Sequence, residues 1–165
     1  EAVKYLMDMG HRKIGFIGEN LTKSKAKHFR TAMNEYALPI REEYIIISEE
    51  RFEIAGYHSM EKLLELKERP TAVIFGYDYM ALGAMKCIKD HGLAVPDDIS
   101  LIGMDNIRSL PYWDTPLTTI SSHSKTQCNL AFDLLLKKMK NKYYSENHML
   151  EATLIKRDSV KNLKD

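Results

Sequence analysis

Acidic and aromatic side chains follow two apolar segments of this sequence where strands are expected to end. Tyr77 and Asp78 come shortly after the apolar residues 71–75, and Asp105 comes shortly after residues 99–103. A carboxylate can accept hydrogen bonds from two neighbouring hydroxyl groups, and an aromatic ring packs against the apolar face of a sugar. These side chains therefore suit a small polyhydroxylated ligand.

Short apolar segments alternate with segments of helical period along most of the chain. Strands are expected at residues 13–18, 44–48, 71–75, 99–103, 117–120 and 152–156, and the main helices at 24–36, 54–66, 79–91 and 124–140. Continuous apolar strands that alternate with helices are typical of a parallel sheet covered on both faces. We therefore predict an α/β fold with a doubly wound, mostly parallel sheet.

The carboxyl ends of such strands are where ligands bind in open α/β sheets. The residues at these ends are Glu19 and Asn20, Arg51 and Phe52, Tyr77 and Asp78, and Asp105 and Asn106. Asp78 directly precedes a helix, so capping of that helix is an alternative to ligand contact. Phe52 has the alternative of a core position. No helix pattern follows Asp105, which favours a ligand contact there.

Several other chemistries lack their sequence patterns. The segment GFIGEN at residues 15–20 is neither GxGxxG nor GxxxxGK[ST], so a nucleotide site has little support. The six histidines are scattered, without HExxH, and no GxSxG occurs. We therefore expect no metal, no cofactor and no enzymatic activity.

The charge balance restricts the partners of this segment. The chain has 165 residues with 24 basic and 23 acidic side chains, and this balance argues against nucleic-acid or membrane-surface binding by bulk electrostatics. No apolar run approaches the ~18 residues of a membrane span, and residues 1–9 do not resemble a signal peptide. Cys87 and Cys128 lie in expected helices without short spacing, so we expect buried, reduced thiols in a cytoplasmic protein.

Five segments of the sequence carry a resemblance to a known family. They are GHRKIGFIG (10–18), PTAVIFGYDYMALGAM (70–85), GLAVPDDISLIGMDN (92–106), PLTTI (116–120) and RDS (157–159). In this order they resemble the effector-binding domain of the lactose-repressor/galactose-repressor (LacI/GalR) family of bacterial transcription regulators. The likeness covers nearly the whole chain. It implies a periplasmic-binding-protein-like type I fold with two subdomains.

The resemblance also implies an incomplete two-subdomain sensor. Residues 1–12 would end the N-terminal subdomain, 13–121 would form the C-terminal subdomain, 122–150 would return to the N-terminal subdomain, and 151–165 would supply a final strand and tail of the C-terminal subdomain. The family's DNA-binding headpiece is absent from this segment. We therefore expect operator DNA to be bound only through a headpiece outside it.

The resemblance assigns roles to several residues of this sequence. Asp105 matches the sugar-binding aspartate of the GxDD/GxDN motif, and Asp78 matches the acid of the family's Asn-Asp pair. Tyr77 stands at the Asn of that pair, and it offers one hydroxyl in place of an amide. Lys25 stands at an effector-contacting arginine, whose bidentate contact a lysine cannot make. Phe52, or Arg51 if no gap is allowed, stands at the stacking aromatic. Together with Asn20, Asp105, Tyr77, Asp78, Lys25 and Phe52 are the expected ligand-binding residues.

A dimer is also expected from the resemblance. Trp113 aligns with a position that helps to form the dimer face of the C-terminal subdomain, with a partly buried loop tryptophan as the alternative. Tyr112 and the apolar helix face at Met80 and Leu82 support the same expectation.

The leading functional hypothesis is a regulator, a repressor in the family's manner, whose operator affinity is set by a small sugar-like effector. The alternative is a periplasmic-type sugar-binding protein of a transport system, because the fold is shared. An enzyme on a Rossmann-like scaffold would require a phosphate loop or a nucleophile–base pair, and neither pattern is present.

Overall fold

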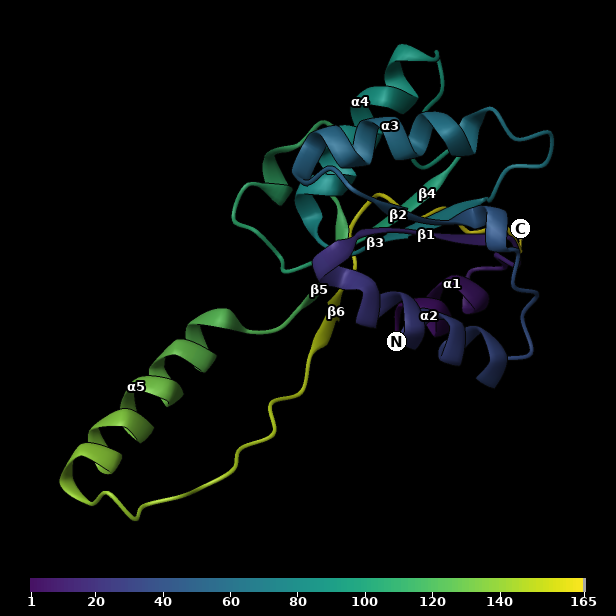
Figure 1. The fold of residues 1–165 in the computed structure, drawn as a ribbon. Coiled ribbons are helices and arrows are strands. Elements are labelled where there is room, and N and C mark those ends of the chain that lie inside the picture. Colours follow the sequence, from purple (N-terminus) through teal and green to yellow (C-terminus); the bar gives the residue numbers. More distant parts are fainter. Residues whose placement is uncertain (165) are drawn as a thin grey trace.

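A single six-stranded sheet forms the centre of the protein, whose computed structural model describes residues 1–164 (Figure 1). The strands are β1 (Ile14–Glu19), β2 (Ile45–Ser48), β3 (Ala72–Phe75), β4 (Ser100–Met104), β5 (Thr118–Ser121) and β6 (Thr153–Ile155). Their spatial order is β2-β1-β3-β4-β5-β6. The first five strands are parallel, and β6 is antiparallel to β5. The predicted α/β fold is confirmed.

Helices cover both faces of this sheet. α1 (Ala2–Asp8) and α2 (Lys23–Glu35) lie on one face, and α3 (Phe52–Leu64) and α4 (Asp78–Asp90) lie on the other (Figure 1). Short 3-10 turns at η1 (Asn20–Thr22), η2 (Glu42–Tyr44) and η3 (Leu110–Tyr112) connect the elements. Each element expected from the sequence lies within two residues of its predicted bounds.

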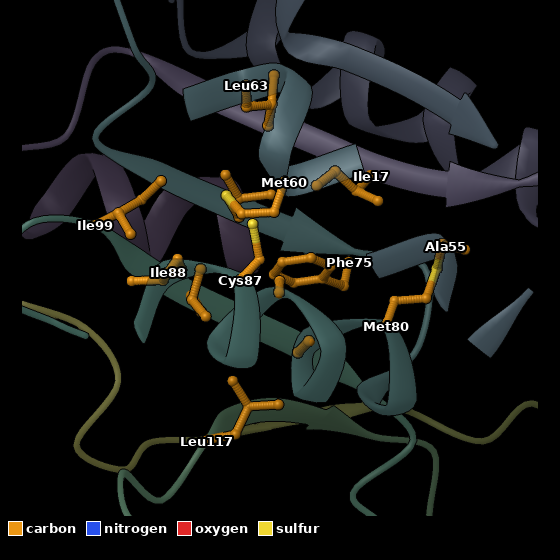
Figure 2. Close-up of a cluster of buried hydrophobic side chains, with 14 of the residues drawn as sticks. Ile17, Ala55, Met60, Leu63, Phe75, Met80, Cys87, Ile88, Ile99 and Leu117 are labelled. Atoms are coloured by element: carbon orange, nitrogen blue, oxygen red, sulfur yellow. The ribbon is translucent and has the colours of Figure 1, made fainter. Parts of the chain in front are cut away.

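The two helical layers enclose separate cores. On the α3/α4 side, Met60, Phe75, Met80 and Cys87 are completely buried between the helices and the sheet (Figure 2). On the α1/α2 side, Phe16 of β1 stacks on Phe29 of α2 with ring centroids 5.6 Å apart. The fully buried strands β1 and β3 contribute side chains to both cores, as their mainly apolar sequences predict.

Two glycines bring α3 and α4 into backbone contact. A Cβ atom at Gly56 would lie 1.8 Å from the carbonyl oxygen of Met80, and one at Gly83 would lie 1.8 Å from that of Glu53. Only hydrogen fits at both positions. The helix pair is therefore closely packed, which fixes the start of α4 beside the start of α3.

One helix stands away from this body. α5 (Ser124–Lys140) extends from the end of β5, and the chain returns through residues 141–152 to β6 (Figure 1). No residue of α5 is buried, and its exposed apolar side chains include Phe132, Leu135, Leu136 and Met139. The expectation of two buried thiols is therefore wrong for Cys128, which is exposed on α5, whereas Cys87 is buried. Both cysteines are free.

Candidate functional site

The carboxyl ends of β1 and β3 form the point at which the strand order reverses. From β1 the chain crosses α2 to β2 on one side, and β3 then pairs with the opposite side of β1. In open α/β sheets the loops after two such strands diverge, and ligands bind at this point. Lys25 of α2 spans the gap, because its Nζ donates a hydrogen bond to the carbonyl oxygen of Gly76 at 2.6 Å.

The end of β1 is shaped by a capping arrangement. The buried carboxylate of Glu19 accepts a hydrogen bond from the backbone N–H of Leu21 at 3.0 Å, and the Glu19 N–H donates to the Thr22 hydroxyl at 2.8 Å. Glu19 thus starts η1 and is not directed at a ligand. Asn20, the next residue, is exposed and available at the edge.

An aromatic cluster lies where α3 begins. Phe52 is 45% exposed, and its ring meets Tyr77 and Tyr79 edge-to-face at 5.8 and 6.2 Å between centroids. The Tyr77 hydroxyl accepts a hydrogen bond from the Phe52 N–H at 2.9 Å, and this bond helps to hold Phe52 at a φ of 59°. The guanidinium of Arg51 lies 4.7 Å from the Phe52 ring centroid. The exposure of Phe52 excludes the core position that the sequence left open.

Asp78 lies behind the edge and is completely buried. It is the first residue within α4, after the N-cap residue Tyr77, so it does not occupy the capping position. Its Oδ2 accepts a hydrogen bond from the N–H of Ile107 at 2.9 Å, and its Oδ1 accepts one from the Thr119 hydroxyl at 2.7 Å. Burial raises the pKa of Asp78 to about 6, although these two hydrogen bonds favour the ionised form.

Asp105 directly follows β4 and is an exposed residue. Its backbone has a φ of 106°, and Asn106 follows with a φ of 52°. The Asp105 N–H donates to the carbonyl oxygen of Ile120 at 2.8 Å. Partial burial of the carboxyl group raises the pKa of Asp105, and the positive charge of Lys25 opposes that shift. The charges of Lys25 and Asp105 therefore attract each other along this edge.

Arg157 completes this edge, and its role was not predicted. Its Nη2 donates to Asn106 Oδ1 at 2.8 Å, and its Nη1 donates to the carbonyl oxygen of Leu117 at 2.6 Å. Its position in the RDS segment was the only signal in the sequence. Tyr79 of the aromatic cluster and Thr119 were also missed.

The residues expected at a dimer face lie together around one groove. Leu82, Tyr112 and Trp113 line one groove of about 530 Å³ between α4 and the segment after it. A second hollow of about 600 Å³ adjoins Leu82 and includes Ile54 and Tyr57 of α3. Tyr112 is 87% exposed. The structure thus brings the three residues together on one surface.

Residues 1–164 lack the features of two other kinds of site. Within this part of the chain, no three histidine, cysteine, aspartate or glutamate side chains are grouped so that they could hold a metal ion. Nor does any described helix combine the length and apolarity needed to cross a membrane.

Comparisons with known proteins agree with this architecture. Residues 3–160 match the family described as periplasmic binding protein-like domain. The chain is 43% identical over 173 aligned residues to the HTH-type transcriptional repressor PurR of Glaesserella parasuis, covering 98% of the chain and 51% of the relative. It is 37% identical to the ribose operon repressor of Haemophilus influenzae, covering 99% of the chain and 50% of that protein. A crystal structure of a LacI family transcriptional regulator from Enterococcus faecium, with bound ribose, superposes with a TM-score of 0.87 at 25% identity, covering 99% of this chain and 62% of that one.

The fold and its carboxyl edge are those of a periplasmic binding protein-like ligand-binding domain. The chain belongs to this family. Within it, the chain corresponds to the effector-binding domain of LacI/GalR regulators. It spans about half the length of the curated relatives that it matches.

Proposed function

We propose that this chain is the effector-sensing part of a LacI/GalR-type repressor. The observation that carries the proposal is the position of two opposite charges along the carboxyl edge of the sheet. Asp105 follows β4 and Lys25 reaches over from α2, and the positive charge of Lys25 acts to lower the pKa of Asp105, which supports a shared site. Such an edge is where α/β proteins bind small ligands.

The proposed ligand is a small sugar or sugar derivative. The exposed Asp105 carboxylate accepts hydrogen bonds from hydroxyl groups, the Lys25 ammonium donates to a ring or hydroxyl oxygen, and the half-exposed Phe52 ring packs on the apolar C–H face. Tyr77 and Asn20 border the same edge. The ribose bound in a similar structure supports this class of ligand.

The proposed mechanism is a population shift between two subdomain arrangements. Residues 13–121 would form the C-terminal subdomain and residues 122–150 would return to an N-terminal subdomain, which closes over the edge when effector binds. Effector that binds one arrangement more tightly favours it, and operator affinity changes by the same coupling free energy. DNA contact would come from a headpiece outside this chain, in a cytoplasmic homodimer.

The alternatives have less support. The relatives named above are repressors, which favours a regulator over a transport protein and over an enzyme.

The test is a DNA-binding titration of the full-length protein, on sites that it selects from random sequence, with ribose and a panel of other sugars. At least one sugar should change DNA affinity by about 5- to 150-fold. Asp105→Ala should abolish this response, whereas Asp8→Ala, at an exposed position beside Lys4, should retain it. If no sugar changes DNA affinity in the unaltered protein, and Asp105→Ala binds DNA as that protein does, the proposal fails.

A further inference from the structure

The segment that presents Asp105 has an unusual backbone. Asp105 and Asn106 are consecutive non-glycine residues at positive φ, 106° and 52°. Residues other than glycine adopt this region at a cost, and they keep it only where the surroundings fix them. Residues 105–107, here termed the Asp105 loop, therefore require partners outside the loop itself.

Asp78 supplies the partners on one side. One carboxylate oxygen accepts from the N–H of Ile107, the last residue of the loop, at 2.9 Å. The other accepts from the Thr119 hydroxyl at 2.7 Å, which orients that hydroxyl so that its lone pair faces the N–H of Asn106, 3.4 Å away. One buried carboxylate thus reaches two successive amides of the loop, one directly and one through Thr119.

The local packing is shaped to admit this carboxylate. A Cβ atom at Gly103 would lie 2.1 Å from Asp78 Oδ1, so the side chain can take this position only because β4 has glycine there. Asp78 is completely buried, and both of its oxygens are already bonded within the protein. Its contact with the site is therefore through the loop.

Arg157 holds the loop from the other side. Its two terminal nitrogens join Asn106 Oδ1 to the carbonyl oxygen of Leu117, at 2.8 and 2.6 Å, so the loop is tied to the chain just before β5. The backbone N–H of Arg157 also donates a hydrogen bond to the Thr118 hydroxyl at 2.9 Å, and this bond anchors the arginine itself.

We propose that Asp78 and Arg157 are positioning residues that fix the Asp105 loop and thereby set the orientation of the ligand-binding carboxylate. The role in ligand binding rests on the proposed function, whereas the hold on the loop does not depend on any ligand. Loss of either partner releases the loop from its positive-φ conformation, and Asp105 then samples orientations that cannot bind effector.

The charge state of Asp78 provides a readout that a purely structural residue would lack. A protonated carboxyl has one oxygen that has become a donor, so it can no longer accept strongly from both Ile107 and Thr119. The charged groups that act on Asp78 are Asp105, which raises its pKa, and Arg157, which lowers it. The loop should therefore loosen as pH falls through about 6, the pKa of Asp78.

The experiment is hydrogen–deuterium exchange of the full-length protein without ligand, followed by mass spectrometry of peptides that cover residues 104–110. After correction for intrinsic exchange rates, protection of this segment should fall about tenfold in Asp78→Asn at pH 7.5, because an amide group offers one acceptor fewer. Thr119→Val should act in the same direction. Asp90→Asn, at an exposed ion pair on the same helix, is the matched control and should leave the segment unchanged.

Exchange protection measured against pH in the unaltered protein tests the proposal even if a variant fails to fold. In the unaltered protein, protection of residues 104–110 should fall between pH 7 and pH 5, and in Asp78→Asn it should be constant over that range. Equal protection in the unaltered protein and the variant, or a flat profile in the unaltered protein, would overturn the proposal.

The effect on ligand binding is measured with ribose. Calorimetric affinity for ribose should fall about tenfold in Asp78→Asn and in Arg157→Gln, in parallel with the loss of protection. Intact ribose affinity alongside lost protection would overturn the link from the loop to the site. If the unaltered protein binds no ribose or other sugar, the proposed function fails, and the exchange data still decide whether Asp78 and Arg157 hold the loop.

Discussion

The buried carboxylate of Asp78 combines two opposing effects at the scale of a single residue. Burial favours its neutral form, whereas the hydrogen bonds from Ile107 and Thr119 favour its charged form. The pKa of about 6 shows that burial is the larger effect. Protonation should consequently make the fold as a whole more stable while it loosens the loop that Asp78 holds.

This sign can be checked by measuring stability against pH. Because the pKa of Asp78 is higher in the folded than in the unfolded protein, its contribution to stability is present at low pH and is lost as pH rises through about 6. The free energy of unfolding of the unaltered protein, relative to Asp78→Asn, should therefore rise by about 1 kcal/mol from pH 7.5 to pH 5. Urea titrations at both pH values give the difference. A fall over this range would contradict the assignment.

Gly103 offers a second prediction at this scale. The substitution Gly103→Ala places a methyl group 2.1 Å from Asp78 Oδ1 and 2.7 Å from the Leu117 side chain, which should cost about 2 kcal/mol of stability. Gly92→Asn is the control, because no atom lies within 4 Å of its Cβ position and asparagine tolerates its φ of 71°. Equal midpoints of thermal unfolding for the two variants would show that a methyl group fits at position 103 and would contradict this prediction.

The sequence predicted some of these residues and not others for a physical reason. Asp105 was identifiable because it directly follows an apolar strand, and Lys25 because of the resemblance of its helix to a family pattern. The partners of Asp78 were not identifiable, since they depend on how closely α4 approaches β4 and β5 in space. Arg157 follows β6, whose place beside β5 no local pattern reveals.

At the scale of elements, α5 is the exception to an otherwise well-covered fold. The exposed side chains of Phe132, Leu135, Leu136 and Met139 have no partner within the described chain, and an apolar helix face of this kind normally packs against another element. Its helical period made the bounds of α5 predictable. Its lack of cover, and hence the exposure of Cys128, was not predictable from that period.

We propose that the N-terminal subdomain of the full-length protein covers this face of α5. Amide exchange within residues 124–140 should then be at least about tenfold slower in the full-length protein than in the 165-residue chain, because tertiary packing supplies most helix stability. Exchange within β3, which is buried along its whole length in the 165-residue chain, serves as the control. Equal exchange of α5 in the two proteins would show that it has no partner in the longer one.

At the scale of the whole molecule, the groove beside Leu82 and Trp113 lies on a different surface from the carboxyl edge. A dimer formed there would leave the ligand site open. The substitution Leu82→Glu puts a charge into this apolar surface and should weaken dimerisation of the full-length protein by about a hundredfold. Sedimentation analysis measures the effect, with Leu163→Glu, at an exposed position near the C-terminus, as the control. A dimer unaffected by Leu82→Glu would place the interface elsewhere.

We expect the carboxyl edge of the sheet to bind the effector. A crystal structure of the full-length protein, soaked with ribose and other sugars, can show whether it does. We predict sugar density at the carboxyl edge, with hydroxyl groups within hydrogen-bond distance of the Asp105 carboxylate and the Lys25 ammonium. The Phe52 side chain should pack against the sugar ring. Sugar bound elsewhere while this edge holds only solvent, or an Asp105 side chain directed away from the bound sugar, would contradict it.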